Sequence, residues 1–287
     1  MDRRRCVQAL AAAGVVVAIP AGANPKRRLR IGLTPVILAD QMAFLSRWGR
    51  YLSNQIGCEV SFVTRESYQT VLDLLYAGQL DVAWICGYPY VRHAADLELL
   101  AVPLYRGQPL YKAYLIRSRR SREPINGWSD MGGKVLAYSD PLSNSGWLVA
   151  QAQLAKAGLG GSDLKRAFFA HGHRNVAEAV SAQLAQAGAM DGYVWDTMQL
   201  QGMTAVAQTQ VVWESASFGF PPLVTRRGAV HPCQAELFQA LLAMPGDDTG
   251  RQLLRDLNLT GFTEGHETLF DSIRQQARGV AGSGLVA

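Results

Sequence analysis

The sequence predicts an α/β protein of two lobes, each a mainly parallel sheet flanked by helices, with a two-segment hinge between them. Three observations support this fold class. The 287 residues suggest two domains at about 150 residues each. Hydrophobic residues make up 48% of the chain and charged residues 18%, which is enough apolar material for packed cores. Strand and helix signals alternate along the chain, as they do in sheets built from βαβ units.

The first 23 residues are predicted to form a secretory signal peptide. Arginines at positions 3–5 precede an uncharged apolar run over 7–19, Pro20 ends this run, and small residues at 21–23 suit signal-peptidase cleavage. A transmembrane anchor needs about 20 apolar residues, so this shorter run does not favour one. The leader therefore predicts export of the mature chain, by the Sec or the twin-arginine route.

The first predicted lobe is discontinuous and comprises residues 24–112 and 225–287. Hydrophobic periodicity predicts strands over 29–33, 58–63, 81–85 and 97–104, and helices over 39–56 and 68–77. Ser67 is a favourable N-cap for the second helix, and Gly78 is typical of its end. In the returning part we expect helices over 235–242, 251–257 and 266–278.

The second predicted lobe, residues 113–224, is inserted into the first. Here the pattern predicts strands over 134–138, 164–169, 190–194 and 205–213, and helices over 147–157 and 175–187. Two extended stretches, 111–117 and 223–226, are expected to cross between the lobes as the hinge. Open α/β sheets bind ligands at the carboxyl ends of their strands, and hinged lobes close on a small molecule. The architecture therefore predicts a binding cleft.

Charge and cysteine content exclude several classes of protein. Loss of the leader, which carries three arginines and one aspartate, lowers the net charge from +5 to +3. No lysine or arginine cluster is interleaved with aromatic residues, so nucleic acid is not an expected partner. Cys58, Cys86 and Cys233 remain without a CxxC pair, so we expect neither a cysteine metal site nor a disulfide framework. A long-range disulfide between two of them stays open.

The segment over 139–146 is the strongest candidate for ligand binding. It joins the strand over 134–138 to the following helix, whose first turn offers unpaired N–H groups and a dipole that attracts anions. Ser143 and Ser145 add hydroxyl donors, while Asn144 and Gly146 allow a close approach of the backbone. The alternative is an ordinary capped helix start. A phosphate loop of the P-loop type is excluded because no lysine follows Gly146.

Three further side chains stand at positions that a cleft would use. His173 follows the strand over 164–169, where its imidazole can donate a hydrogen bond to a bound oxyanion. His171 and His173 form an HxH pair, but no third ligand is in place, so zinc is not expected. Tyr68 stands just inside the helix that Ser67 caps, and Tyr111 lies in the first crossing stretch.

A serine hydrolase is the rival hypothesis from another class. Ser145, His173 and either Asp191 or Asp196 supply the residue types of a catalytic triad. The G-x-S-x-G motif is missing, because no glycine stands two residues before Ser145. The chain order also differs from that of the α/β-hydrolases. We therefore expect no enzyme and keep hydrolysis as a lesser alternative.

Taken together, these motifs resemble the phosphate/phosphite/phosphonate substrate-binding proteins of ABC transporters, which have the type 2 periplasmic binding protein fold. The similarity runs from about residue 29 to 242. The segment over 140–146 matches the family's Asp-Pro-x-Ser-x-Ser-Gly motif, and 84–90 is similar to its Trp-x-Gly-Pro segment. The resemblance implies that the oxyanion is bound by residues at the positions Ser143, Asn144, Ser145, Gly146, His173, Tyr68 and Tyr111.

Two departures from the family pattern concern the ligand. Asn144 replaces the middle residue of the family's Ser-Thr-Ser triplet. Aminophosphonate binders hold the ligand's ammonium with a Glu after the histidine and an Asp near the second crossing. Tyr193 stands at or near the first of these places, which makes it a candidate ligand residue, and Pro221-Pro222 stands near the second. The residues that bind the oxyanion in the family are mostly present, whereas those that bind the ammonium are replaced, so an aminophosphonate is not expected.

The resemblance implies a monomeric periplasmic protein that captures a small oxyanion and presents it to an ABC permease in the inner membrane. It requires no cofactor and breaks no bond. Two other functions remain open besides hydrolysis. One is a binding protein for an unrelated small organic acid, and the other is a sensory module that hands its closed form to a membrane receptor.

Overall fold

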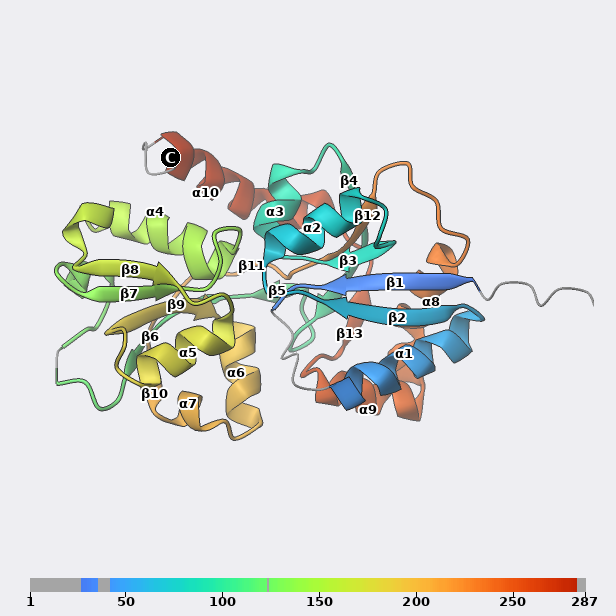
Figure 1. The fold of residues 1–287 in the computed structure, drawn as a ribbon, viewed down its shortest axis with the longest axis horizontal. Coiled ribbons are helices and arrows are strands. Elements are labelled where there is room, and N and C mark those ends of the chain that lie inside the picture. The colour runs from blue at the N-terminus through green and yellow to red at the C-terminus, as the bar shows by residue number, and fades with distance from the viewer. Residues whose placement is uncertain (1–26, 36–41, 123, 283–287) are drawn as a thin grey trace, which may run out of the picture.

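The computed structural model describes residues 27–35, 42–122 and 124–282, and the predicted signal peptide lies outside them. Two sheets, each covered by helices, stand side by side (Figure 1). We call the six-stranded sheet with its helices lobe 1, at the right of Figure 1, and the five-stranded sheet with its helices lobe 2, at the left. The two-lobed α/β prediction is thereby confirmed.

Lobe 1 is built from both ends of the described chain. Its elements are β1 (Arg28–Leu33), α1 (Met42–Ile56), β2 (Glu59–Thr64), α2 (Tyr68–Tyr76), β3 (Val82–Trp84), α3 (Gly87–Arg92), β4 (Leu97–Leu104), β12 (Leu223–Arg226), α8 (Gln234–Ala243), η4 (Met244–Gly246), α9 (Asp248–Asp256), β13 (Gly261–Thr263), η5 (Glu267–Phe270) and α10 (Asp271–Gly282). The sheet order is β13-β4-β12-β3-β1-β2. Figure 1 shows α10 reaching from lobe 1 toward lobe 2. It packs on α3 of lobe 1 and on α4 (Val149–Lys156) of lobe 2.

Lobe 2 is one continuous stretch of chain. Its elements are β6 (Ala113–Ser118), η1 (Trp128–Met131), β7 (Val135–Tyr138), the π-helical segment η2 (Asn144–Leu148), α4, η3 (Gly161–Asp163), β8 (Arg166–Phe169), α5 (His173–Ser181), β9 (Ala187–Asp191), α6 (Gly192–Leu200), α7 (Thr204–Ala207) and β10 (Thr209–Glu214). The sheet order is β10-β6-β9-β7-β8.

The hinge strands match the predicted crossings only in part, because most of the stretch 111–117 and all of 223–226 belong to the sheets of the lobes. β5 (Leu110–Tyr111) and β11 (Phe218–Gly219) pair as a separate two-stranded sheet on the path between the lobes. After β5 the chain enters the lobe 2 sheet as β6 at Ala113. It rejoins the lobe 1 sheet as β12 at Leu223, two residues ahead of the predicted return at 225. The division of the chain into moving bodies at 112/113 and 224/225 stays a prediction.

The sheets are mixed rather than mainly parallel. β1 pairs in parallel with β2 and β3, and β7 pairs in parallel with β8 and β9. The returning strand β12 enters lobe 1 between β3 and β4 and runs antiparallel to both. In lobe 2 the crossing strand β6 runs antiparallel to β9 and β10. The strands next to the hinge therefore supply much of the antiparallel pairing, and in lobe 1 β13 adds a further antiparallel pair with β4.

Local sequence accounts for the elements that position the cleft. The buried face of α1 includes Phe44, Trp48 and Leu52, which recur at the helical spacing. Ser67 caps α2 as predicted, because its side chain accepts a hydrogen bond from the Thr70 N–H at 3.2 Å. Gly78 follows the helix with φ +68°, a conformation that favours glycine. The N-terminus of α2 is thereby fixed at the edge of the cleft.

Several elements differ from the prediction. The predicted strand over 190–194 is instead β9, which ends at Asp191, followed by the helix α6. The Asp191 side chain caps α6 by accepting from the Val194 N–H at 3.3 Å, so the apolar run after it is helical. The predicted helix over 175–187 is α5, which begins at His173 and already ends at Ser181, and the predicted strand over 205–213 divides into α7 and β10. The short helix α3 was not predicted.

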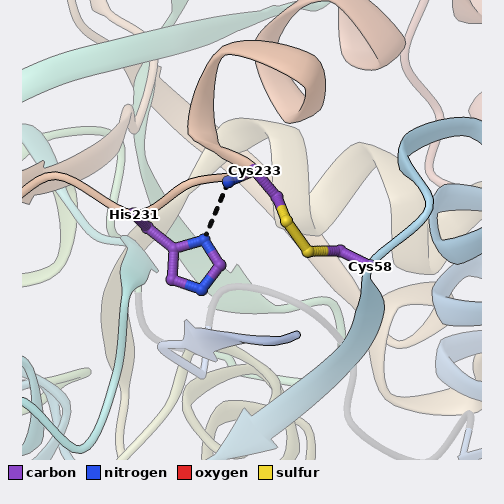
Figure 2. A group of neighbouring side chains, drawn as sticks. All are labelled: Cys58, His231 and Cys233. Atoms are coloured by element: carbon purple, nitrogen blue, oxygen red, sulfur yellow. Dashed lines mark hydrogen bonds between the residues drawn. A yellow bond between two sulfur atoms is a disulfide. The ribbon is translucent and has the colours of Figure 1, made fainter. Parts of the chain in front are cut away.

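A disulfide ties the two parts of lobe 1 together (Figure 2). It joins Cys58, just before β2, to Cys233, just before α8, across 175 residues of sequence. His231 lies beside it: its Nδ1 accepts from the Cys233 N–H at 3.2 Å, and its Nε2 lies 3.1 Å from the Arg28 carbonyl oxygen. The three side chains lie close enough to suggest a metal site. Zinc binds the thiolate form of cysteine, and neither sulfur of the disulfide is a thiolate, so this group does not form a zinc site while the bond is intact.

Within the described ranges, none of the helices has the length and hydropathy that crossing a bilayer requires.

Candidate functional site

The carboxyl ends of strands from both lobes meet the N-terminus of α2 and the hinge strand β5 in one buried cluster. All the predicted site residues except Tyr193 belong to it. Tyr68 comes from α2, Tyr111 from β5, Ser143, Asn144, Ser145 and Gly146 from the turn after β7, and His173 from the start of α5. Each of the polar side chains is at most 2% exposed. Residues distant in sequence thus form a single enclosed polar site between the lobes.

The turn after β7 presents the donors that the sequence predicts. Ser143 caps η2, and its Oγ accepts from the Gly146 N–H at 3.0 Å, which leaves its hydroxyl hydrogen free to donate. A β-carbon on Gly146 would collide with Ser139 and come within 3.1 Å of His173 Cε1. Only glycine therefore allows this turn to pack against the strand end and the imidazole.

His173 is a neutral hydrogen-bond donor in this site. Its Nδ1 accepts from the Asp191 N–H at 3.0 Å, and a backbone N–H can only donate. Burial lowers the pKa of His173 to about 3, so the ring is neutral and its proton sits on Nε2. Nε2 lies 3.3 Å from the Tyr68 hydroxyl and 3.5 Å from Ser143 Oγ. The imidazole is thus oriented to donate toward the Tyr68 and Ser143 hydroxyls.

Hydrogen bonds across the cleft hold the two lobes together. The Tyr68 N–H of lobe 1 donates to Asp140 Oδ2 of lobe 2 at 3.3 Å. The Asn144 backbone N–H of lobe 2 donates to Cys86 Sγ of lobe 1 at 3.3 Å, and the Asn144 Nδ2 donates to the Tyr111 hydroxyl of the hinge strand β5 at 3.0 Å. The structure therefore represents the closed arrangement of the lobes.

Several polar atoms of the cluster are buried without a hydrogen-bond partner. They include Ser145 Oγ, Asn144 Oδ1 and Ser139 Oγ. The Ser145 hydroxyl lies beside the Asp191 carboxyl and the Tyr111 hydroxyl but makes no hydrogen bond of regular geometry with either. Leaving such a group unpaired costs about 1–3 kcal/mol, so the atoms are poised for a ligand rather than for packing.

Asp191 is a site residue that sequence reasoning missed. The sequence offers it as a candidate triad acid, inside a strand that is predicted to continue past it. In the structure it ends β9, caps α6 and is 1% exposed. Burial raises the pKa of Asp191 to about 7. The signal available in the sequence was its place directly before Gly192, at the carboxyl end of a short apolar strand.

The site contains acids but gains no cation from its hydrogen-bond partners. Burial also raises the pKa of Asp140, whose carboxylate accepts from the Leu142 N–H at 2.8 Å. No lysine or arginine is among the residues that these hydrogen bonds join. Negative charge on a ligand would therefore be met by neutral hydroxyl, imidazole, amide and backbone donors.

The geometry contradicts a catalytic triad. A triad histidine donates from Nδ1 to a carboxylate and accepts the serine proton at Nε2. Here the Nδ1 of His173 accepts from a backbone N–H, so Nε2 carries the proton and cannot act as the base. Asp196, the other candidate acid, accepts from the Tyr105 hydroxyl at 2.5 Å and from Arg106 at 3.0 Å instead.

Tyr193 does not join the cluster. Its hydroxyl donates to the Leu257 carbonyl of lobe 1 at 2.6 Å, and its ring packs edge-on against Phe220 and Tyr105. It therefore links α6 to lobe 1 beside the hinge.

A cavity of about 940 Å³ lies at the mouth of the cleft and is lined by both lobes. Lobe 1 contributes Thr34, Arg65 and Ser67, and lobe 2 contributes His171 and Arg174. Ser67 and Gly172, which also line it, directly precede Tyr68 and His173 of the cluster. The cavity thus adjoins the cluster along the chain, although none of the buried donor side chains lines it.

The chain resembles known binding proteins over most of its length. A curated relative, the phosphate-import protein PhnD of Mycolicibacterium smegmatis, is 32% identical over 179 residues, which are 58% of this chain and 56% of the relative. The chain therefore matches little more than half of that relative's length.

Two solved structures show the same fold at low sequence identity. A binding protein component of an ABC phosphonate transporter from Pseudomonas aeruginosa has a TM-score of 0.82 at 20% identity, over 89% of this chain and 87% of that one. PhnD1 from Prochlorococcus marinus, solved in complex with methylphosphonate, has a TM-score of 0.78 at 18% identity, over 89% of this chain and 98% of that one. The predicted type 2 periplasmic binding protein fold is thereby confirmed.

A family model described as "ABC transporter, phosphonate, periplasmic substrate-binding protein" matches residues 31–270, well over half of the sequence. That family consists of solute-binding proteins and not of enzymes. With its two lobes closed over a buried set of neutral donors, the chain belongs to the family of periplasmic substrate-binding proteins of phosphonate ABC transporters.

Proposed function

We propose that the protein captures a tetrahedral phosphorus oxyanion of the phosphonate, phosphite or phosphate type between its lobes. The observation that carries this proposal is the set of buried hydroxyl and imidazole groups that meet at the strand ends, with Ser145 Oγ and Asn144 Oδ1 still unpartnered. The names of the relatives support the same ligand class, since one is a phosphate importer and another is bound to methylphosphonate.

The proposed ligand set consists of Ser143, Ser145, His173, Tyr68 and Tyr111, with Asn144 and Gly146 shaping the turn. A hydrogen bond to a charged acceptor contributes about 1.5–3 kcal/mol net. Micromolar affinity corresponds to about 8 kcal/mol. Four such bonds, less the entropy lost on closure, therefore suffice for a micromolar ligand without any cationic side chain.

The protein would act as a monomer in the periplasm after removal of residues 1–23. Its lobes would open and close about β5 and β11, with 24–112 and 225–287 moving as one body and 113–224 as the other. The closed form would be presented to an ABC permease in the inner membrane. Size-exclusion chromatography with light scattering tests the monomer, and a dimer at micromolar concentration would contradict it.

Isothermal titration of the mature protein with methylphosphonate, phosphite, phosphate, sulfate and succinate tests the ligand class. We expect heats with one or more of the phosphorus oxyanions and none with succinate. Ser143→Ala combined with Ser145→Ala should weaken binding at least tenfold, because two donors to a charged acceptor are lost. Ser162→Ala, at an exposed serine of η3, is the matched control and should bind like the native protein.

Three results would contradict the proposal. Unchanged affinity in the double variant would show that Ser143 and Ser145 do not bind the ligand. Heats with succinate alone would favour the organic-acid function. Turnover of an ester substrate that Ser145→Ala abolishes would establish the hydrolase that the geometry argues against.

A further inference from the structure

Cys86 lies in the wall of the binding cluster. It stands at the carboxyl end of β3, directly before α3, and is 1% exposed. Its thiol is free, whereas Cys58 and Cys233 are bonded to each other. The Asn144 N–H donates to its Sγ at 3.3 Å across the cleft, so Cys86 faces the donor turn rather than the lobe 1 core.

The neighbours of this sulfur are the proposed ligand groups. The Tyr111 hydroxyl and the Asp191 carboxyl lie close enough to interact electrostatically with the thiol. The unpartnered Ser145 Oγ lies close to both of these groups, and the unpartnered Asn144 Oδ1 belongs to the residue that donates to Cys86. Two buried polar atoms without partners therefore belong to Asn144, which donates to the thiol, and to Ser145, which shares the neighbours of the thiol, and this points to a ligand in this part of the cluster.

Cys86 differs in chemistry from the other groups around it. A thiol is a weak donor and a weak acceptor, and when buried it behaves as a small hydrophobic group. The groups on the other sides of the cluster are hydroxyls, an imidazole N–H and amides, all of which bond well to oxygen. An oxyanion oxygen placed against Cys86 would lose a hydrogen bond that water supplies, while a hydrogen or methyl substituent would lose nothing.

We propose that Cys86 is a specificity-determining residue, which receives the hydrogen or methyl substituent of a three-oxygen phosphorus oxyanion. The site would then prefer phosphite and methylphosphonate to phosphate, whose fourth oxygen would face the sulfur. This inference rests on the proposed function and names its substrate class.

The test measures dissociation constants for phosphite, methylphosphonate and phosphate in the native protein, in Cys86→Ser and in Cys86→Ala. The native protein should bind the better of the two three-oxygen anions at least tenfold more tightly than phosphate. Cys86→Ser offers a hydroxyl of similar size, which bonds to the fourth oxygen and should reduce that ratio at least tenfold. Cys86→Ala keeps the wall apolar and should preserve the preference.

The outcomes separate this inference from the proposed function. If the native protein binds none of the three anions, the proposed function fails. If it binds them but favours phosphate, or if Cys86→Ser leaves the ratio unchanged, the role of Cys86 fails and the function stands. Thermal melting of each variant with and without ligand identifies a variant that has not folded, and in that case Cys86→Thr, which also carries a hydroxyl, replaces Cys86→Ser.

Discussion

Asp191 and His173 set the protonation state of the site together. The Asp191 backbone N–H holds the His173 ring with its proton toward the cleft, while the Asp191 carboxyl lies beside Ser145. An ionised carboxylate about 4 Å from an anion would repel it by about 4 kcal/mol at an effective dielectric constant of about 20. A bound oxyanion therefore requires a protonated Asp191, which its raised pKa of about 7 makes available near neutral pH.

Binding should weaken as the pH rises above about 7. Below this pKa the Asp191 carboxyl is already protonated before the ligand binds. Above it, Asp191 must take up a proton each time the ligand binds, which lowers the affinity about tenfold per pH unit. Titrations with methylphosphonate from about pH 6 to about pH 9 measure the slope. Asp191→Asn keeps the helix cap and should flatten that part of the slope, while the ligand's own ionisation affects both proteins equally. The same slope in both proteins would contradict the role of Asp191.

Gly146 is the residue at which a single methyl group should block the site. A β-carbon at this position would lie 2.7 Å from Ser139 Cβ, which cannot move without shifting the end of β7. We expect Gly146→Ala to lower stability by about 1–3 kcal/mol and to weaken oxyanion binding at least tenfold. Chemical unfolding and calorimetry measure the two effects.

Gly127→Ala is the matched control for Gly146→Ala. Gly127 has φ 179°, an extended conformation open to any residue, and a β-carbon there meets nothing within 4 Å. Its affinity and stability should remain those of the native protein. Equal behaviour of the two variants would show that the turn after β7 tolerates a side chain.

At the scale of elements, the sequence predicted the strands and helices whose periodicity is local. β4 and β12 have the predicted bounds, and α2 has the predicted N-cap. The errors occur where tertiary contacts decide. The run after Asp191 has the composition of a strand, but the Asp191 cap and packing against lobe 1 through Tyr193 make it the helix α6. α3 is only six residues long and contains Pro89, so it carries no periodic signal.

The candidate site was predictable to the extent that its residues follow strand ends or cap helices. The turn over 143–146, His173 and Tyr68 all do so, and the structure brings them together with Tyr111. Cys86 and Asp191 were missed because their roles depend on which strand ends become neighbours after folding. Tyr193 was chosen by counting along the chain, and the side of α6 that it occupies is set by the true start of that helix.

The disulfide between Cys58 and Cys233 should stabilise lobe 1. It closes a long loop, since 175 residues separate the two cysteines, and a bond of this kind typically adds about 2–5 kcal/mol to the free energy of unfolding. Cys58→Ser combined with Cys233→Ser should lose that amount in urea unfolding. Dithiothreitol should lower the native midpoint and leave the double variant unaffected. Equal midpoints for the native and double-variant proteins would contradict a stabilising bond.

At the scale of the whole molecule, contacts between α6 and lobe 1 support the closed arrangement. The Tyr193 hydroxyl donates to the Leu257 carbonyl, and Asn258 Nδ2 donates to Thr197 Oγ1 at 2.9 Å. Asp196 of the same helix accepts from Tyr105 and Arg106 at the approach to the hinge. These bonds lie outside the ligand cluster, so they affect the energy of closure without touching the ligand.

Tyr193→Phe removes one of these bonds and keeps the aromatic packing. A neutral hydrogen bond contributes about 0.5–1.5 kcal/mol, so oxyanion affinity should fall about 2- to 10-fold through a less favourable closure. Small-angle scattering should show the variant reaching the compact form at saturating ligand but at higher ligand concentration than the native protein. An affinity equal to that of the native protein would show that this hydrogen bond does not favour the closed form, and would contradict its role in closure.

A crystal structure of the mature protein with methylphosphonate tests the central claim most directly. The account predicts one phosphonate enclosed between the lobes, with its oxygens within hydrogen-bond distance of Ser143, Ser145 and His173 Nε2 and its methyl group toward Cys86. A phosphonate held instead by Arg65 and Arg174 at the mouth of the cleft, with the serine and histidine groups still packed against one another, would contradict it.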